Sequence, residues 1–344
     1  MVKKVAPDLF MITQTAKGRF IKFSVNVFVI GGVDGLIFDA GYGKRKANNY
    51  LAAQIKQIEK EMRDNGRECN ITSILPSHGH WDHFSGVTKL RDKLGVTVLA
   101  TKRMLKSIGS KKNYIKSYQN ANELIELPSS AFRKSLRKTS NLLLNELIML
   151  LLGVNFVTGP LKLVGENSTI FINKKPWEII LLPGHCDDAI VLYNRKDGIL
   201  LCGDNILRSV TTWLGPPKSD LKAYIRSLEY LLTLPDLKLI LPAHGSPITE
   251  PVKRIKETIN HRHQRTKEMR VIISQTGNAG ISFDEIFKKF YPTVKFYEKY
   301  ILTGWILTTL EYLIQEKEIV SFIEEKRKKF RAYASTEIIS SNII

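Results

Sequence analysis

The chain has 344 residues, of which 43% are hydrophobic and 25% are charged, and its formal net charge is +19 at pH 7. This composition excludes an intrinsically disordered or fibrous protein, and the length predicts a large domain with a second, smaller one. The positive charge favours acidic partners such as nucleic acid, phosphorylated cofactors or anionic lipid, and does not choose among them.

The three cysteines Cys69, Cys186 and Cys202 are scattered along the chain. They lack the paired spacing of a disulfide framework or a zinc ribbon, which fits a reducing compartment. The N-terminal stretch MVKKVAPDLFMITQ has no continuous apolar segment of the kind found in a secretory signal. We therefore expect a cytoplasmic protein.

The first hundred residues predict alternating strands and helices. NVFVIGG and GLIFDAG, joined by a glycine turn, are typical of a β-hairpin, and residues 48–66 have the apolar spacing of a helix. A short apolar strand is expected at 71–77, a helix at 87–95 and another strand at 96–101. This alternation is typical of a layered α/β domain.

An insertion is expected at about residues 102–160. Its first part, 102–138, has ten Lys or Arg residues against two glutamates, and its second part, 141–157, is strongly apolar but too short to span a bilayer. We expect a lid over the functional site. A helix lying on a lipid surface and a helix buried in the core are the alternatives, and no transmembrane segment is expected.

The stretch ILPSHGHWDHFSG, residues 74–86, contains three histidines and one aspartate within six positions. In an extended loop, residues two apart point the same way, so His78 and His80 can converge on one metal ion. Asp82 and His83 then face a second position. A site rich in imidazole favours zinc, with iron or manganese as alternatives.

Three later residues, His185, Asp204 and His244, each follow an apolar strand-like run. Such residues can meet at one edge of a sheet. The order HxHxDH, PGH, GD and PAHG resembles the metallo-β-lactamase-fold superfamily over about residues 5–260. The resemblance implies an α/β fold, a four-layer αββα sandwich with a dinuclear metal site between its two sheets.

The resemblance also implies a role for each ligand. His78, His80 and His185 would bind one zinc ion, Asp82, His83 and His244 the other, and Asp204 would bridge both. Asp82 would also be catalytic, because it can orient the hydroxide that bridges the metals and accept its proton.

Two positions indicate to which branches of the superfamily the chain does not belong. Asp204 stands where zinc β-lactamases of the best-known class have cysteine, and His80 stands where flavodiiron oxidoreductases usually have a carboxylate. Antibiotic hydrolysis and oxygen reduction are therefore disfavoured. Residues 186–188, Cys-Asp-Asp, depart from the small-residue turn that follows PGH in many relatives.

The C-terminal residues resemble a small winged-helix module, which one branch of β-lactamase-like hydrolases and endoribonucleases carries. We expect a catalytic domain at 1–262 and a winged-helix-like domain at 263–344. His261 and His263 are two apart on a predicted helix, so they face different directions and are expected to be surface or packing residues.

The primary hypothesis is a dinuclear zinc hydrolase of a small-molecule thioester, ester or lactone. A basic segment beside an apolar one suits an acyl group carried on a phosphorylated thiol such as coenzyme A, and Trp213 and Leu214 are expected to contact the substrate. The alternatives are a metal-dependent endoribonuclease and a nucleic-acid-binding or scaffold protein with a relic metal site. Peripheral lipid contact and homo-oligomerisation stay open.

Overall fold

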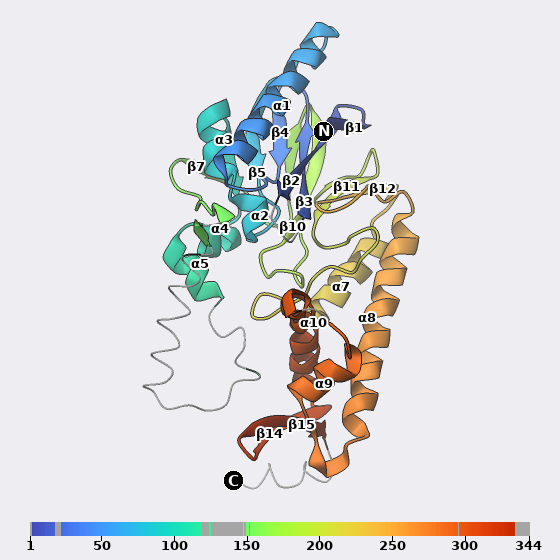
Figure 1. Cartoon of the computed structure of the whole chain (residues 1–344). Helices are drawn as coiled ribbons and strands as arrows, with labels where there is room; N and C mark the ends of the chain where they lie inside the picture. The colour runs from blue at the N-terminus through green and yellow to red at the C-terminus, as the bar shows by residue number, and fades with distance from the viewer. Residues whose placement is uncertain are drawn as a thin grey trace.

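A computed structural model describes residues 2–17, 22–118, 124, 147, 149–150, 152–294 and 296–333 (Figure 1). About half of the predicted lid at 102–160 lies outside the described residues. Of the apolar stretch 141–157, the described residues 147, 149, 150 and 152 are helical. Two short helices, α4 (Lys102–Ile108) and α5 (Lys111–Ser117), form the described start of the insertion.

The first sheet has seven strands in chain order. The first four strands pair antiparallel and the last three extend the sheet in parallel. The predicted hairpin at its centre is confirmed, since Phe28 pairs with Phe38 and Ile30 with Leu36. The strands are β1 (Val2–Ala6), β2 (Leu9–Lys17), β3 (Lys22–Ile30), β4 (Gly35–Phe38), β5 (Ile71–Leu75), β6 (Thr97–Ala100) and β7 (Leu161–Leu163).

The second sheet has five strands in the order β12-β11-β10-β9-β8. Only β11 and β12 pair in parallel, and the other pairs are antiparallel. All the residues of β10 and β11 are buried, as expected for strands covered on both faces. The strands are β8 (Ser168–Ile172), β9 (Lys175–Leu181), β10 (Ile190–Asn194), β11 (Ile199–Gly203) and β12 (Leu239–Pro242).

Helices cover the outer faces of both sheets. On the first sheet lie α1 (Arg45–Asp64) and α3 (Val87–Leu94), and the predicted apolar side of α1 is buried. On the second sheet, α7 (Leu221–Leu232) and the beginning of α8 (Pro251–Ser274) share a separate apolar cluster with the outer side chains of β10 and β11. The layers therefore run helix, sheet, sheet, helix, the predicted four-layer sandwich.

The C-terminal part forms its own small core, with Phe283, Leu310 and Phe330 among its buried residues. After α8 come a 3-10 turn (Gly277–Ala279), β13 (Ile281–Ser282), α9 (Phe283–Phe290), α10 (Phe296–Gln315), β14 (Ile319–Glu324) and β15 (Arg327–Ala332). The strands pair in the order β13-β15-β14. We refer to residues 263–333 as the C-terminal module; its identity as a winged helix stays a prediction.

Helix α8 links the two parts without a break. It runs through the predicted boundary at 262–263, burying Ile259 in the cluster of the second sheet and Met269 in the core of the C-terminal module. Figure 1 shows this helix extending along one side of the molecule from the sandwich to the module. Within the described residues, no helix is both long and apolar enough to cross a bilayer.

Candidate metal centre

Five strands end at the same edge of the sandwich, and the polar residues gather there. Asp39 follows β4, the loop with His78 and His80 follows β5, and the loop with His185 follows β9. Asp204 follows β11 and His244 follows β12. The helix α2 (Trp81–Phe84), whose first residue directly follows His80, carries Asp82 and His83.

Three imidazoles lie together as a candidate ligand group, called the first ligand group below: His78, His80 and His185. Their facing nitrogens make a small triangle, with 2.9 Å from His78 Nε2 to His80 Nδ1, 3.0 Å from His80 Nδ1 to His185 Nε2, and 3.2 Å from His185 Nε2 to His78 Nε2. His80 thus turns a different ring nitrogen inward from the other two. His78 and His185 are each 1% exposed.

Hydrogen bonds on the far side fix two of these rings. His185 Nδ1 donates to the backbone carbonyl of Trp213 over 2.7 Å, and His78 Nδ1 lies 2.9 Å from Ser77 Oγ. Ser77 Oγ can accept from His78 because its own proton is directed at Asp39 Oδ2, 3.1 Å away. Each Nε2 is then left as a lone pair directed at the centre of the triangle.

The second ligand group consists of Asp82, His83 and His244. His83 Nε2 lies 3.6 Å from Asp82 Oδ1, and His244 Nε2 lies 3.5 Å from Asp82 Oδ2. Behind these rings, His83 Nδ1 contacts Asp39 Oδ2 over 3.0 Å and His244 Nδ1 donates to the carbonyl of Ser24. The carboxylate and the carbonyl hold both rings with Nε2 facing inward.

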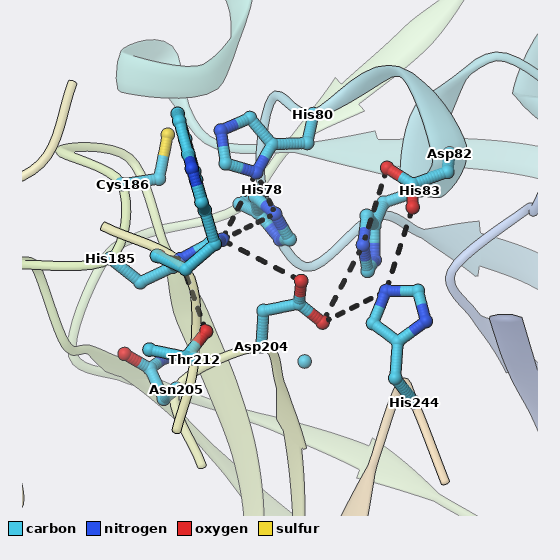
Figure 2. A network of polar contacts seen from close by, with 12 residues as sticks. His78, His80, Asp82, His83, His185, Cys186, Asp204, Asn205, Thr212 and His244 are labelled. Carbon is cyan, nitrogen blue, oxygen red and sulfur yellow. Dashed lines mark hydrogen bonds and ion pairs between the residues drawn. The ribbon is translucent and has the colours of Figure 1, made fainter. Parts of the chain in front are cut away.

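Asp204 lies between the two groups (Figure 2). Its Oδ2 is 3.7 Å from His185 Nε2, whereas its Oδ1 is 3.6 Å from His83 Nε2 and 3.4 Å from His244 Nε2. Each carboxylate oxygen therefore faces a different ligand group. This is the arrangement a carboxylate needs in order to bridge two cations.

The pKa values of the histidines shift in opposite directions in the two groups. Burial, and after it the neighbouring His83, holds the pKa of His78 well below its ordinary value. Burial, and after it His185, does the same to the pKa of His80, and burial also lowers the pKa of His185. In the second group burial again acts to lower the pKa, but nearby carboxylates outweigh it. The pKa of His83 is raised well above its ordinary value, chiefly by Asp39, and Asp204 raises that of His244 to about 9.

The donor set fits divalent metal ions. Zinc binds imidazole at about 2.0–2.1 Å, so tetrahedral ligands lie about 3.3 Å apart, close to the sides of the histidine triangle. Within the described residues, the buried atoms His83 Nε2 and Asp204 Oδ1 have no hydrogen-bond partner. Two sets of side chains each bring their ligand atoms close enough together to hold one ion. The first set is His78, His80, His185 and Asp204, and the second is Asp82, His83 and His244.

The sequence reasoning missed Asp39, which is fully buried and has a left-handed backbone conformation, with φ of 68°. It accepts hydrogen bonds from the backbone N–H and the hydroxyl of Ser77, over 2.6 Å and 3.1 Å, and contacts His83. One carboxylate therefore supports a histidine in each group. Its position after the apolar run GLIF was the available signal, since His185, Asp204 and His244 also follow such runs.

The unusual residues 186–188 contribute a second buried carboxylate. Asp188 is fully buried and accepts hydrogen bonds from the backbone N–H of Gly79 over 3.2 Å and from the hydroxyl of Ser107 over 3.0 Å. A Cβ on Gly79 would lie 2.7 Å from Asp188 Oδ2, so a larger residue between His78 and His80 would displace this carboxylate. Cys186 is buried beside Asp188 as a packing residue, and its thiol donates a hydrogen bond to Asp188 Oδ1 over 2.9 Å.

Trp213 and Leu214, the two residues expected to contact a substrate, lie in different surroundings. The Trp213 ring lies 5.9 Å from the His80 ring, at the centre, whereas Leu214 is 1% exposed and packs in the apolar cluster under the second sheet. Leu214 is therefore not placed to contact a substrate. Tyr118 was not expected, and its ring lies 6.5 Å from His80. The exposed His261 and His263 lie on α8.

The chain resembles known proteins over most of its length. It is 24% identical over 331 residues to the "Probable metallo-hydrolase YqjP" of Bacillus subtilis (strain 168), covering 89% of this chain and 93% of that one. It is 22% identical over 224 residues to a bovine protein named "Acyl-coenzyme A thioesterase MBLAC2", covering 64% and 72% of the two chains.

A metallo-beta-lactamase family protein from Thermus thermophilus shares the fold, with a TM-score of 0.71, 18% identity, and coverage of 96% of this chain and all of that one. The family model of the metallo-beta-lactamase superfamily matches residues 21–111 and 122–244, which include every ligand named above. The chain therefore belongs to the metallo-beta-lactamase superfamily and is a metallo-hydrolase.

Proposed function

We propose that the protein binds two zinc ions and hydrolyses a small-molecule thioester, with esters and lactones as related substrates. The observation that carries this proposal is the position of Asp204, whose two carboxylate oxygens face two complete ligand groups. A relative named for acyl-coenzyme A thioesterase activity supports the thioester as the first substrate class to test.

Two divalent cations in this centre would acidify a bound water and polarise the carbonyl of the substrate. The protein's own residues provide the remaining parts of the reaction. Asp82, whose side chain is 17% exposed, can orient the attacking water and accept its proton on a carboxylate oxygen. Oxygen then adds to the acyl carbon, the carbon–sulfur bond breaks, and the leaving thiolate takes up a proton to give a thiol and a carboxylic acid.

Two aromatic residues flank the first ligand group and support an apolar substrate. Trp213 and Tyr118 lie on loops from different parts of the chain, and both rings lie close to His80. Aromatic rings beside a metal ligand exclude water and provide apolar contact for an acyl chain. In this proposal the acyl group lies against Trp213 and Tyr118.

The surface of α4 and α5 supports a phosphorylated thiol carrier. Exposed cations lie on both helices, and α5 ends at Ser117, directly before Tyr118, which lies beside the centre. Such a surface attracts phosphate groups, and the carrier end of an acyl-coenzyme A would extend over it. The exposed cations are Lys102, Arg103, Lys106, Lys111, Lys112 and Lys116.

The direct test measures metal content together with turnover. The purified protein is assayed with acyl-coenzyme A, a short-thiol thioester, a lactone and single-stranded RNA, before and after chelation and zinc replacement. About two zinc ions per chain and chelator-sensitive thioester cleavage are expected. Full metal content without cleavage of any ester, thioester or lactone would contradict the proposed substrate class.

The endoribonuclease alternative rests on the net charge and the C-terminal module. RNA cleavage that is lost on chelation, without thioester cleavage, would replace the thioester proposal with this one. The complete set of seven ligands argues against a relic site, since a scaffold has no need to keep both groups and their supporting hydrogen bonds. A metal-loaded protein that binds RNA and cleaves nothing would favour the scaffold.

A further inference from the structure

Helix α10 of the C-terminal module makes an unusually close contact with the loop at residues 212–215. Gly304 lies in the middle of this helix, where glycine is about 1 kcal/mol less favourable than alanine. A Cβ at this position would collide with the backbone carbonyl of Leu214 and lie 2.8 Å from Trp213 Nε1. The close approach of the loop explains why a helix interior carries glycine here.

Helix α8 holds the same loop from a second side. The side chain of Arg262 is buried, with 5% exposure, and its Nη2 donates a hydrogen bond to the backbone carbonyl of Thr212. Burying a guanidinium is costly, and Arg262 Nε has no hydrogen-bond partner within the described residues, so the bond from Nη2 to the loop is a needed compensation. The C-terminal helices thus touch two successive residues of the loop, Thr212 and Trp213.

These two residues of the loop also contact the first ligand group. The Trp213 carbonyl accepts from His185 Nδ1, and Thr212 Oγ1 lies 3.3 Å from the same nitrogen. The Trp213 ring lies against His80. The loop therefore connects α8 and α10 directly to two of the three imidazoles.

We propose that the C-terminal module, together with the adjoining residue Arg262 of α8, completes the metal centre, with Gly304 and Arg262 as positioning residues for the loop at 212–215. Through Trp213 they set the ring of His185 and one wall of the substrate site. This inference rests on the proposed metal function. No direct contact of the module with nucleic acid is needed to explain its presence.

The first experiment compares Gly304→Val with a matched control, Glu316→Ala. Glu316 directly follows α10 and pairs at the surface with Lys222 of α7 over 2.6 Å. Zinc affinity is measured by competition with a fluorescent chelator, and the Tm of the metal-free protein is measured in parallel. Loss of a residue that orients a metal ligand costs about 10–100-fold in metal affinity.

We expect Gly304→Val to weaken the binding of one of two zinc ions by about 10-fold or more, and Glu316→Ala to leave both affinities within about twofold. Equal affinities in wild type and Gly304→Val would overturn the inference. If Gly304→Val does not fold, Arg262→Met decides, because it removes the hydrogen bond to Thr212 without adding volume to α10; unchanged zinc affinity there would also overturn it.

Trp213→Phe separates the two roles of Trp213. It keeps the backbone carbonyl that holds His185, so zinc affinity should stay within about twofold, while the smaller ring should raise KM for an acyl thioester several-fold. If the wild-type protein binds two zinc ions but cleaves no thioester, the proposed substrate is wrong, and the zinc affinity of Gly304→Val still tests the positioning role. A wild type that cleaves thioesters with unchanged zinc affinity in Gly304→Val defeats the positioning role alone.

Discussion

The two ligand groups lie a few ångströms apart, but different parts of the molecule hold them. The first group consists of three neutral imidazoles, held by the Ser77 hydroxyl and by the Trp213 carbonyl on a loop that the C-terminal helices touch. In the second group the carboxylate of Asp39 and a carbonyl of β3 hold the rings, so its support comes from the sandwich alone.

This difference shows how one centre can depend on two folding units. The second group requires only that β4, β5 and β12 end, and that β3 begins, at this edge of the sandwich. The first group additionally requires the loop at 212–215, and through it Gly304 and Arg262. Damage to one group should therefore leave the other group able to bind metal, except where a residue belongs to both.

Asp204 faces both groups directly, whereas Asp39 reaches the first group only through Ser77, so the loss of Asp204 should have the largest effect. Asp204→Ala removes both oxygens that face the groups, and we expect turnover to fall on the order of 10³-fold or more, as for the loss of a central electrostatic element. Zinc content should fall at both positions, as measured by elemental analysis after dialysis. Full activity in this variant would show that the two groups work without a bridge.

His80→Ala should damage the first group alone. One corner of the nitrogen triangle is lost, so zinc content is expected to fall from about two to about one per chain and turnover by about 10²-fold or more. The fold should persist, because the ring belongs to a loop and not to the cores; circular dichroism checks this. Unchanged turnover with every substrate class would refute the mechanism.

Asp39→Asn should damage mainly the second group. The amide would present an N–H₂ group to His83 Nδ1, which favours the tautomer with a proton on Nε2, where a metal ion has to bind. We expect about 10–100-fold weaker zinc binding at one position. Cobalt(II) absorption spectra can identify which ligand set is lost. Loss confined to the three-histidine group would contradict the separation of the two supports.

Charge reversal on α5 should leave both groups unchanged and affect substrate binding. Lys112→Glu with Lys116→Glu replaces two exposed cations, and KM for acyl-coenzyme A should rise about 3–10-fold, an electrostatic effect that weakens at high salt. KM for a short thioester without phosphates is the internal control and should not change. An equal rise for both substrates would rule out the phosphate contact.

A small effect is expected from Glu311, on the helix that carries Gly304. Burial, followed by the charge of Asp220, raises its pKa to about 7. Since the folded pKa lies above the unfolded value, the free energy of unfolding should fall as pH rises from about 4.5 to 7. Glu311→Gln should reduce this fall by less than about 1 kcal/mol, because the carboxyl is partly exposed. Denaturation at pH 5 and pH 8 measures it.

The sequence predicted which polar residues would meet at this edge of the sandwich, because each follows an apolar run or lies in the dense HGHWDH stretch. Their role as metal ligands stays a prediction. Helix α1 was also predictable, since its buried residues Leu51, Ile55, Ile58 and Met62 have helical spacing. The roles of Asp39 and Gly304 could not be predicted in this way. Asp39 meets Ser77 across 38 positions of the chain, and Gly304 meets Trp213 across an interface that no local pattern marks.

Leu214 shows the opposite failure. Its place in the loop WLGPP, soon after Asp204, favoured a contact with the substrate, and the direction of its side chain depends on the packing of β9, β10 and α7 instead. Neighbouring residues of one loop thus pack in different places, one beside the candidate metal centre and one in an apolar cluster. Trp213 faces the centre, and Leu214 anchors the loop in the apolar cluster beneath it.

The central claim is that Asp204 bridges two metal ions held by two ligand groups. Anomalous diffraction at the zinc edge from crystals of the zinc-loaded protein tests it most directly. We predict two peaks about 3.5–4 Å apart, one at the nitrogen triangle and one between Asp82, His83 and His244, each beside one oxygen of Asp204. A single peak, or two peaks that Asp204 does not join, would contradict the claim.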